Sequence, residues 1–186
     1  VKSYVNERTY SHILGVEREA ASLADIYLPE GERNKARAAA LLHDITKNET
    51  VEKQLQYCRE FGIILGVDPL SPKLYHSKTA AVLIERDFPE FADPEIVSAV
   101  RWHTTGRDNM TVFEAIIYLA DYIEPGRAMD CKPHPLQEVR TACFQNLDNG
   151  MRFALENGIS YLREQNQPID TISLETYEWY QKGITL

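Results

Sequence analysis

His43 and Asp44 are adjacent at the end of an apolar run, and Lys47 follows three residues later. An imidazole and a carboxylate side by side at the edge of a buried segment can both bind one divalent metal ion. A lysine about one helical turn later can contact a phosphate held by that ion. The pattern indicates metal-dependent phosphohydrolase chemistry, provided that the rest of the chain supplies further ligands.

Other residues that can donate to a metal ion occur in separate helical segments. They are His12, His76, His103 and Asp121. Asp121 lies near the end of a strongly apolar segment, where a carboxylate needs a cationic partner. Because the donors are nitrogen and oxygen without thiolates, the set favours Fe, Mn, Zn, Ni or Mg over a structural zinc site. One isolated histidine is more often a hydrogen-bonded, partly buried side chain, so this interpretation depends on the whole set.

Helices must position these residues, because the apolar pattern is helical almost throughout and no segment alternates like a strand. We expect helices at about residues 2–28, 33–45, 49–61, 73–87, 93–103, 112–123, 136–147, 150–164 and 173–182. Residues 66–72 and 104–109 are expected loops because they are rich in residues that favour turns. The expected fold is one all-α domain over residues 1–186. The metal and phosphate site lies mainly within residues 8–127, and the helices at about 136–183 pack beside it.

Composition excludes several classes of protein. The net charge is −8 and no run of Lys or Arg occurs, which argues against nucleic acid as the main partner. No apolar stretch approaches the roughly 20 residues that span a bilayer. No basic leader followed by an apolar segment opens the sequence, and the three cysteines form no CxxC pair. A reducing cytoplasm is therefore the expected location.

Four short strings make the chain resemble a known family. They are YSHILGV (residues 10–16), ALLHDITK (40–47), HTTGR (103–107) and ADYIEPGR (120–127). Their order and helical setting resemble the HD-domain phosphohydrolases, and within these the bacterial YqeK-type proteins that hydrolyse diadenosine tetraphosphate symmetrically. The resemblance extends over nearly the whole chain. It implies an HD-domain helical bundle with additional C-terminal helices.

The resemblance also implies a metal site. The implied ligands are His12, His43, Asp44 and Asp121. The implied metal is a divalent ion, with iron favoured over manganese, and the number of ions, one or two, stays open. His76 and His103 match extra histidines of this branch, which bind either a second metal ion or a phosphate oxygen.

The implied reaction is attack of a metal-activated water on one phosphorus, with Asp44, Lys47 and Asp121 as catalytic residues and ADP as product. Lys47 and Arg127 match phosphate-binding residues, and His76 and His103 are counted with the substrate contacts as well. Two alternatives stay open: an HD enzyme acting on a mononucleotide or cyclic dinucleotide, and a non-enzymatic nucleotide-binding module.

Two further residues have two interpretations each. Thr104 either offers its hydroxyl to a phosphate or belongs to a turn at the end of a helix. Tyr177 either stacks on an adenine ring or docks the last helix on the core. The expected partner is a small nucleotide, with no nucleic acid and no membrane. The aromatic residues of the last helix leave a homodimer open.

Overall fold

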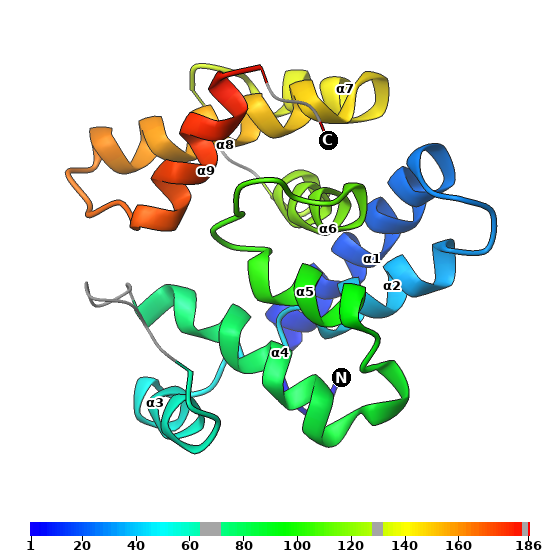
Figure 1. Cartoon of the computed structure of the whole chain (residues 1–186), viewed down its shortest axis with the longest axis vertical. Coiled ribbons are helices and arrows are strands. Elements are labelled where there is room, and N and C mark those ends of the chain that lie inside the picture. Colours follow the sequence, from blue (N-terminus) through cyan, green and yellow to red (C-terminus); the bar gives the residue numbers. More distant parts are fainter. Residues whose placement is uncertain (64–71, 128–131, 184–185) are drawn as a thin grey trace.

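The computed structural model describes residues 1–63, 72–127, 132–183 and 186 of the chain. Within these residues the structure is all-α and contains no strand, as expected (Figure 1). The α-helices are α1 (Glu7–Tyr27), α2 (Arg33–Leu42), α3 (Val51–Glu60), α4 (Tyr75–Asp87), α5 (Pro94–Trp102), α6 (Val112–Ile123), α7 (Leu136–Gln145), α8 (Leu147–Glu164) and α9 (Thr171–Gln181). Two short 3-10 helices, Pro72–Leu74 and Pro89–Phe91, precede α4 and α5. The loop expected at 66–72 lies outside the described residues, except for its last residue.

Three helix ends differ from the prediction by three residues or more, one of them the start of α8, which lies at Leu147 and not at about residue 150. α1 begins at Glu7, not near residue 2, because the Asn6 side chain accepts a backbone N–H hydrogen bond in the first turn and caps the helix. α2 ends at Leu42, not at about residue 45. The earlier end makes His43 the C-cap residue of α2 and leaves Asp44 in the turn that follows.

α6 has the bounds that the sequence predicted, and it forms the middle of the core. Thr111 caps it and forms a capping box with Glu114. Its fully buried side chains include Ile116, Ile117 and Leu119. Asp121 lies in the last turn of α6, so its carboxylate is at the edge of the apolar core.

The other helices pack around α6 in three sets. α1 packs against α2 and α6, α5 packs against α4 and α6, and α8 packs against α6, α7 and α9. Figure 1 shows α7, α8 and α9 above α6, with α3, α4 and α5 below it. The buried apolar cluster extends from Val16 to Tyr180. The assignment of residues 1–186 to one domain stays a prediction.

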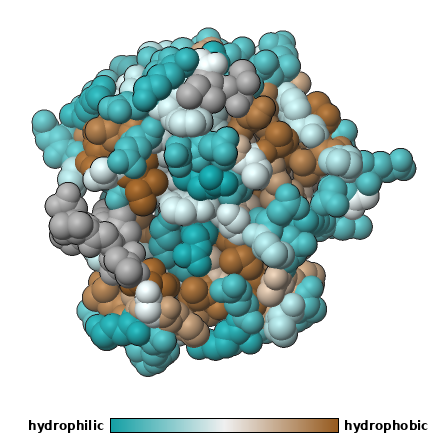
Figure 2. Space-filling model, in the orientation of Figure 1, coloured by the Kyte–Doolittle hydropathy of each residue, from teal (hydrophilic) through white to brown (hydrophobic). Residues whose placement is uncertain are grey.

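The surface mixes polar and apolar side chains. In the face drawn in Figure 2, hydrophilic residues lie in the middle, with groups of apolar residues above and below them. Among the described helices, none combines the length and the apolar character that crossing a membrane requires.

Candidate metal centre and its two pockets

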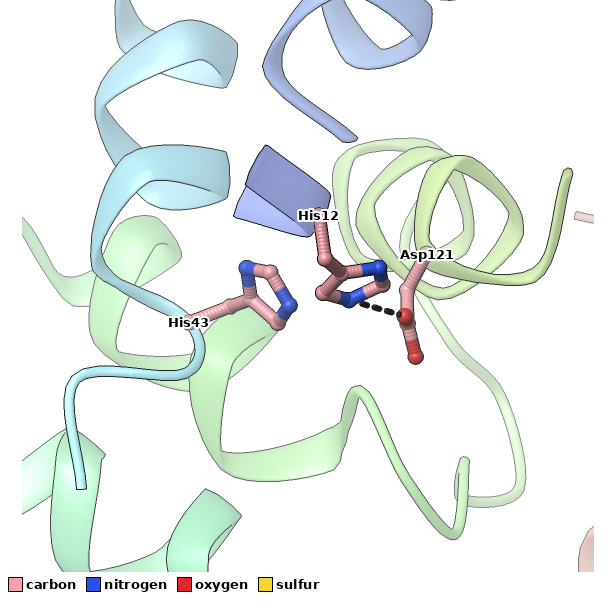
Figure 3. A group of neighbouring side chains, drawn as sticks. All are labelled: His12, His43 and Asp121. Atoms are coloured by element: carbon pink, nitrogen blue, oxygen red, sulfur yellow. Dashed lines mark ion pairs between the residues drawn. The ribbon is translucent and has the colours of Figure 1, made fainter. Parts of the chain in front are cut away.

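Four imidazoles and two carboxylates come together between α1, α4, α6 and the C-terminal ends of α2 and α5. We call this group the donor centre. Its members are His12, His43, Asp44, His76, His103 and Asp121. Figure 3 shows three of them pointing toward one another from three separate elements. All six were predicted from the sequence, and the fold brings them into one cluster.

Three of the imidazoles share one local arrangement. In each, Nδ1 lies at hydrogen-bond distance from the carbonyl oxygen three residues earlier, so the ring donates there through Nδ1–H. The pairs are His43 with Ala40 (2.6 Å), His76 with Lys73 (2.7 Å) and His103 with Val100 (2.7 Å). A neutral imidazole that donates through Nδ1 keeps its lone pair on Nε2. The Nε2 atoms of all three rings face the donor centre.

The fourth imidazole is held by a carboxylate instead. Nδ1 of His12 lies 3.2 Å from Oε1 of Glu124, which is buried. The same carboxylate accepts a hydrogen bond from the Gly126 backbone N–H at 2.6 Å. Gly15 makes the contact possible, because a Cβ atom there would lie 2.6 Å from Oε2 of Glu124. Glu124 was not predicted from the sequence, where its signal is an acid directly before the Pro-Gly turn that follows α6.

Asp44 connects the two halves of the donor centre, because its two oxygens face different rings. Oδ1 lies 3.1 Å from His76 Nε2 and 3.5 Å from His103 Nε2. Oδ2 lies 3.4 Å from His43 Nε2 and 3.6 Å from His12 Nε2. Burial raises the pKa of Asp44, but the surrounding imidazoles outweigh burial and hold this pKa well below its usual value. Asp44 is therefore an ionised, bridging carboxylate.

Asp121 is ionised for a similar reason. Its Oδ1 lies 3.0 Å from His12 Nε2 and 3.0 Å from Nη2 of Arg127. Burial raises the pKa of Asp121, but the charge of Arg127 and the hydrogen bond from His12 hold it well below its usual value. Burial lowers the pKa of His12, yet Asp121 and Asp44 reverse this effect and raise it.

The donor centre fits a bound divalent cation. His43 Nε2 is buried and has no hydrogen-bond partner within the described ranges. The Nε2 atoms of His76 and His103 face each other at 3.1 Å, although each ring already donates through Nδ1. Two lone pairs at that distance need a cation close by; Lys47 Nζ, 3.1 Å from His76 Nε2, supplies one positive charge there, and a bound metal ion would supply more. Burial lowers the pKa of His103, the hydrogen bond with Asp44 opposes this, and the neighbouring imidazoles lower the pKa further, to about 4, so that the ring is neutral and able to ligate.

The donor atoms form two overlapping groups, either of which could hold an ion, and both use Nε2 of His43. One group is His12, His43 and Asp121, and the other is His43, Asp44 and His103. Within each group one donor atom from every residue lies within 4.8 Å of the others. Imidazole nitrogen with carboxylate oxygen suits Fe, Mn and Zn.

Two cations border the donor centre. Lys47 Nζ lies 3.1 Å from His76 Nε2 and 3.4 Å from Asp44 Oδ1. Arg127 contacts Asp121, as described above. Both cations therefore lie where a phosphate bound at the centre would be met by positive charge.

A first pocket of about 330 Å³ opens on the side of the donor centre that faces α8. Its lining residues are Lys47, Lys73, Leu74, His76, His103, Thr104, Tyr118, Asp121, Tyr122, Arg127, Lys132, Ala154, Asn157, Gly158, Tyr161, Leu162 and Glu164. Thr104 reaches this pocket, and its hydroxyl donates to the Ser77 hydroxyl at 3.0 Å.

A second, wider pocket of about 1150 Å³ opens along α1. Its lining residues are Asn6, Glu7, Arg8, Thr9, Ser11, His12, Gly15, Arg18, Asp44, Lys47, Asn48, Glu124, Pro125, Gly126 and Arg127. Lys47 and Arg127 line both pockets.

Tyr177 is the predicted substrate residue that the fold does not bring to the donor centre. It is partly buried and packs against the apolar core, and it lines neither pocket described above. Its neighbour Tyr180 is 1% exposed. Helix α9 is therefore docked on the core through Tyr177 and Tyr180.

Comparison with family models gives a match to the HD domain over residues 9–126. This range contains every member of the donor centre.

Two curated bacterial proteins named "Bis(5'-nucleosyl)-tetraphosphatase, symmetrical" are similar to the chain. The protein from Bacillus subtilis is 32% identical over 183 residues, which cover 98% of this chain and 95% of the relative. The protein from Staphylococcus aureus is 38% identical over 130 residues, covering 69% of this chain and 64% of the relative. Among solved structures, an HD superfamily hydrolase from Clostridium acetobutylicum matches with a TM-score of 0.87 and 31% identity, over 98% of this chain and 93% of that one.

Proposed function

The chain belongs to the HD-domain family, in the branch of the symmetrical bis(5'-nucleosyl)-tetraphosphatases, and we propose that it hydrolyses diadenosine tetraphosphate at its central bridge to give two ADP. The observation that carries the proposal is the donor centre, where four Nε2 atoms and two carboxylates converge between Lys47 and Arg127. A centre of this kind, open to a pocket, suits phosphoryl transfer, which needs charge neutralisation and positioning more than covalent catalysis.

The proposed metal ligands are His12, His43, Asp44 and Asp121. A divalent ion held there polarises a phosphoryl oxygen and lowers the pKa of a water molecule. The ionised carboxylates of Asp44 and Asp121 also orient the attacking water.

The remaining roles belong to residues that line the pockets. Lys47 and Arg127 balance the negative charge that builds up on the transferred and leaving phosphates. His76 and His103 complete a second ion site or contact a phosphate oxygen, and Thr104 offers a hydroxyl at the pocket wall. For Tyr177 the packing on the core favours docking over stacking on a base.

Family membership implies a divalent metal ion, and we propose that this ion is iron and that the donor centre holds two. The placement of Asp44 supports the number two, because its Oδ1 faces His76 and His103 while its Oδ2 faces His12 and His43. Elemental analysis of the protein as purified, before any loading, measures the identity of the ion, and the same analysis after anaerobic loading with iron measures the number. A content of one ion per chain at saturation would rule out the pair.

Product analysis tests the reaction itself. The iron-loaded protein is incubated with diadenosine tetraphosphate and the nucleotides are separated. ADP as the only product is expected, and AMP with ATP, or no turnover, would contradict the proposal. The alternative within the same family is a different nucleotide. A panel of mononucleotides and cyclic dinucleotides decides between them, because a higher kcat/KM for one of these would replace the proposed substrate.

We further propose that the protein acts in the cytoplasm on free nucleotides and binds neither nucleic acid nor membranes. The net charge of −8 and the buried free thiols of Cys58 and Cys143 support this. That the protein forms a homodimer remains a prediction. A measurement of the molar mass in solution determines the oligomeric state.

A further inference from the structure

The two pockets meet at the donor centre, and this arrangement matches the symmetry of a dinucleotide. Lys47 and Arg127 line both pockets, Asp121 lines the first and Asp44 lines the second. A substrate cut at its central bridge has two equal nucleotide arms that extend in opposite directions from the reacting phosphorus. Each arm therefore needs its own space on one side of the centre.

The first pocket has room for only one arm. Pockets that enclose small ligands span about 300–1,000 Å³. At about 330 Å³ the first pocket lies at the lower end of this range, so it suits one nucleoside diphosphate and not two. The second pocket, of about 1150 Å³, begins at the same two cations and offers space for the second arm.

The second pocket carries cations suited to phosphate. Arg8 and Arg18 lie in α1, one turn before His12 and one turn after Gly15, and all four residues line the pocket. Both arginines are exposed, and in the described part of the chain neither has a carboxylate oxygen within 4.0 Å, although the charge of Arg18 also acts on the neighbouring Glu19 and lowers the pKa of that carboxyl in part. The Nε of Arg18 donates to the Leu14 carbonyl at 3.1 Å, which holds its guanidinium along the helix.

The acidic residues of this pocket do not cancel the two arginines. Asp44 belongs to the donor centre, and Glu124 is held by His12 and the Gly126 N–H. Glu7 also lines the pocket, so the arginines leave a net positive charge outside the centre. On the opposite rim, Asn48 accepts a hydrogen bond from the Asn6 backbone N–H at 2.8 Å, which fixes the wall of the pocket.

We propose that the second pocket binds the second nucleotide arm, with Arg8 and Arg18 contacting its phosphates, while the first pocket binds the first arm. The inference rests on the proposed function, since only a dinucleotide substrate has two such arms. After cleavage each pocket holds one ADP, so the metal-loaded protein binds two ADP molecules per chain.

Calorimetric titration of the iron-loaded protein with ADP tests the inference directly. The wild type is expected to bind two ADP per chain, and the double variant Arg8→Ala/Arg18→Ala is expected to bind one. Arg59→Ala, which removes an exposed arginine of α3 outside both pockets, serves as the control and keeps two. One ADP per chain in the wild type, or two in the double variant, would overturn the inference.

Kinetics supply a second measurement. For diadenosine tetraphosphate, each arginine variant is expected to raise KM about tenfold, the loss of one charge-assisted phosphate contact, with the metal content unchanged. An unchanged KM in both variants, while the wild type produces ADP, would overturn the inference and leave the proposed function intact. A wild type that binds two ADP but does not cleave the dinucleotide would instead contradict the proposed function alone.

Discussion

Every imidazole in the donor centre is fixed through Nδ1, whereas the Tyr161 ring on the opposite wall of the first pocket is 48% exposed. The side chain of Asn157, on the same wall, is buried but bonds to the backbone of His134, so it fixes a loop and not a ligand. The centre is thus built for one geometry and the wall for adaptable contact. In the proposed reaction the difference separates the residues that would perform the chemistry from those that would select the substrate.

Removing the bridging carboxylate should have the largest effect, because Asp44 faces both halves of the centre. We expect Asp44→Ala to lower kcat/KM about 10⁴-fold or more and to abolish retention of the metal ion. Turnover assays and elemental analysis of the variant measure both. Asp25→Ala, an exposed carboxylate of α1 that pairs only with Arg33 among the described residues, is the control. If Asp44→Ala kept its metal ion, Asp44 would not be a metal ligand, and the contrast between the donor centre and the pocket wall would fail.

The second largest effect should come from Glu124, which contacts His12 on the side away from the donor centre. Glu124→Gln keeps the shape of the side chain and an oxygen for the Gly126 N–H, but it removes the charge that holds His12. Outer partners of metal-binding histidines contribute about 10- to 100-fold to affinity or activity, and we expect a loss in this range. Metal affinity is measured by competition with a chelator, alongside thermal unfolding. An unchanged affinity with a lower Tm would show that Glu124 is only structural; Glu90→Gln, at an exposed site, is the control.

Replacing Tyr161 in the wall of the first pocket should have a smaller effect, on KM and not on metal binding. Tyr161→Ala removes an exposed ring that a nucleotide base can stack on, and stacking of this kind contributes about 1–3 kcal/mol. We expect KM for diadenosine tetraphosphate to rise about tenfold while the metal content stays at the wild-type value. Tyr4→Ala, a ring 38% exposed outside both pockets, is the matched control. Loss of metal in the Tyr161 variant would contradict the separation of the two regions.

The smallest effect should be on the free energy of unfolding, and it should come from the close contact between Gly106 and Thr176 of α9. Gly106 has φ +66, and a Cβ there would lie 2.6 Å from Cγ2 of Thr176. Gly31 has φ +98 but open space around it, so Gly31→Ala costs backbone strain alone. We expect Gly106→Ala to lower the free energy of unfolding by about 1 kcal/mol more than Gly31→Ala. Urea unfolding measures the difference, and equal costs would mean that α9 is not packed closely on this loop.

The donor centre could be predicted from the sequence because its residues have few other reasons to occur in apolar helices. His43-Asp44 and Asp121 interrupt buried segments, and the matching strings supplied their order. Helix α6 was predictable for a local reason, since Thr111 and Glu114 supply its cap.

The supporting residues were not predictable in the same way. Glu124 precedes a Pro-Gly turn, and only the fold shows that it reaches Nδ1 of His12. Arg18 lies between two glutamates, a pattern typical of a solvated helix face, and its place in a pocket depends on where α1 runs relative to the turn after Asp44. Tyr177 has the residue type of a stacking platform, but packing of α9 directs it to the core.

The carbonyl oxygens of Ala40 and Val100 belong to the last turns of α2 and α5, where a helix has no N–H left to satisfy them. His43 and His103 use these oxygens, so each ring is oriented by the main chain of its own segment. A histidine and the carbonyl three residues before it therefore form a local unit, in which no distant side chain is needed to orient the ring. Pocket residues around this pair of units can therefore change, and with them the substrate, without disturbing the orientation of these two rings.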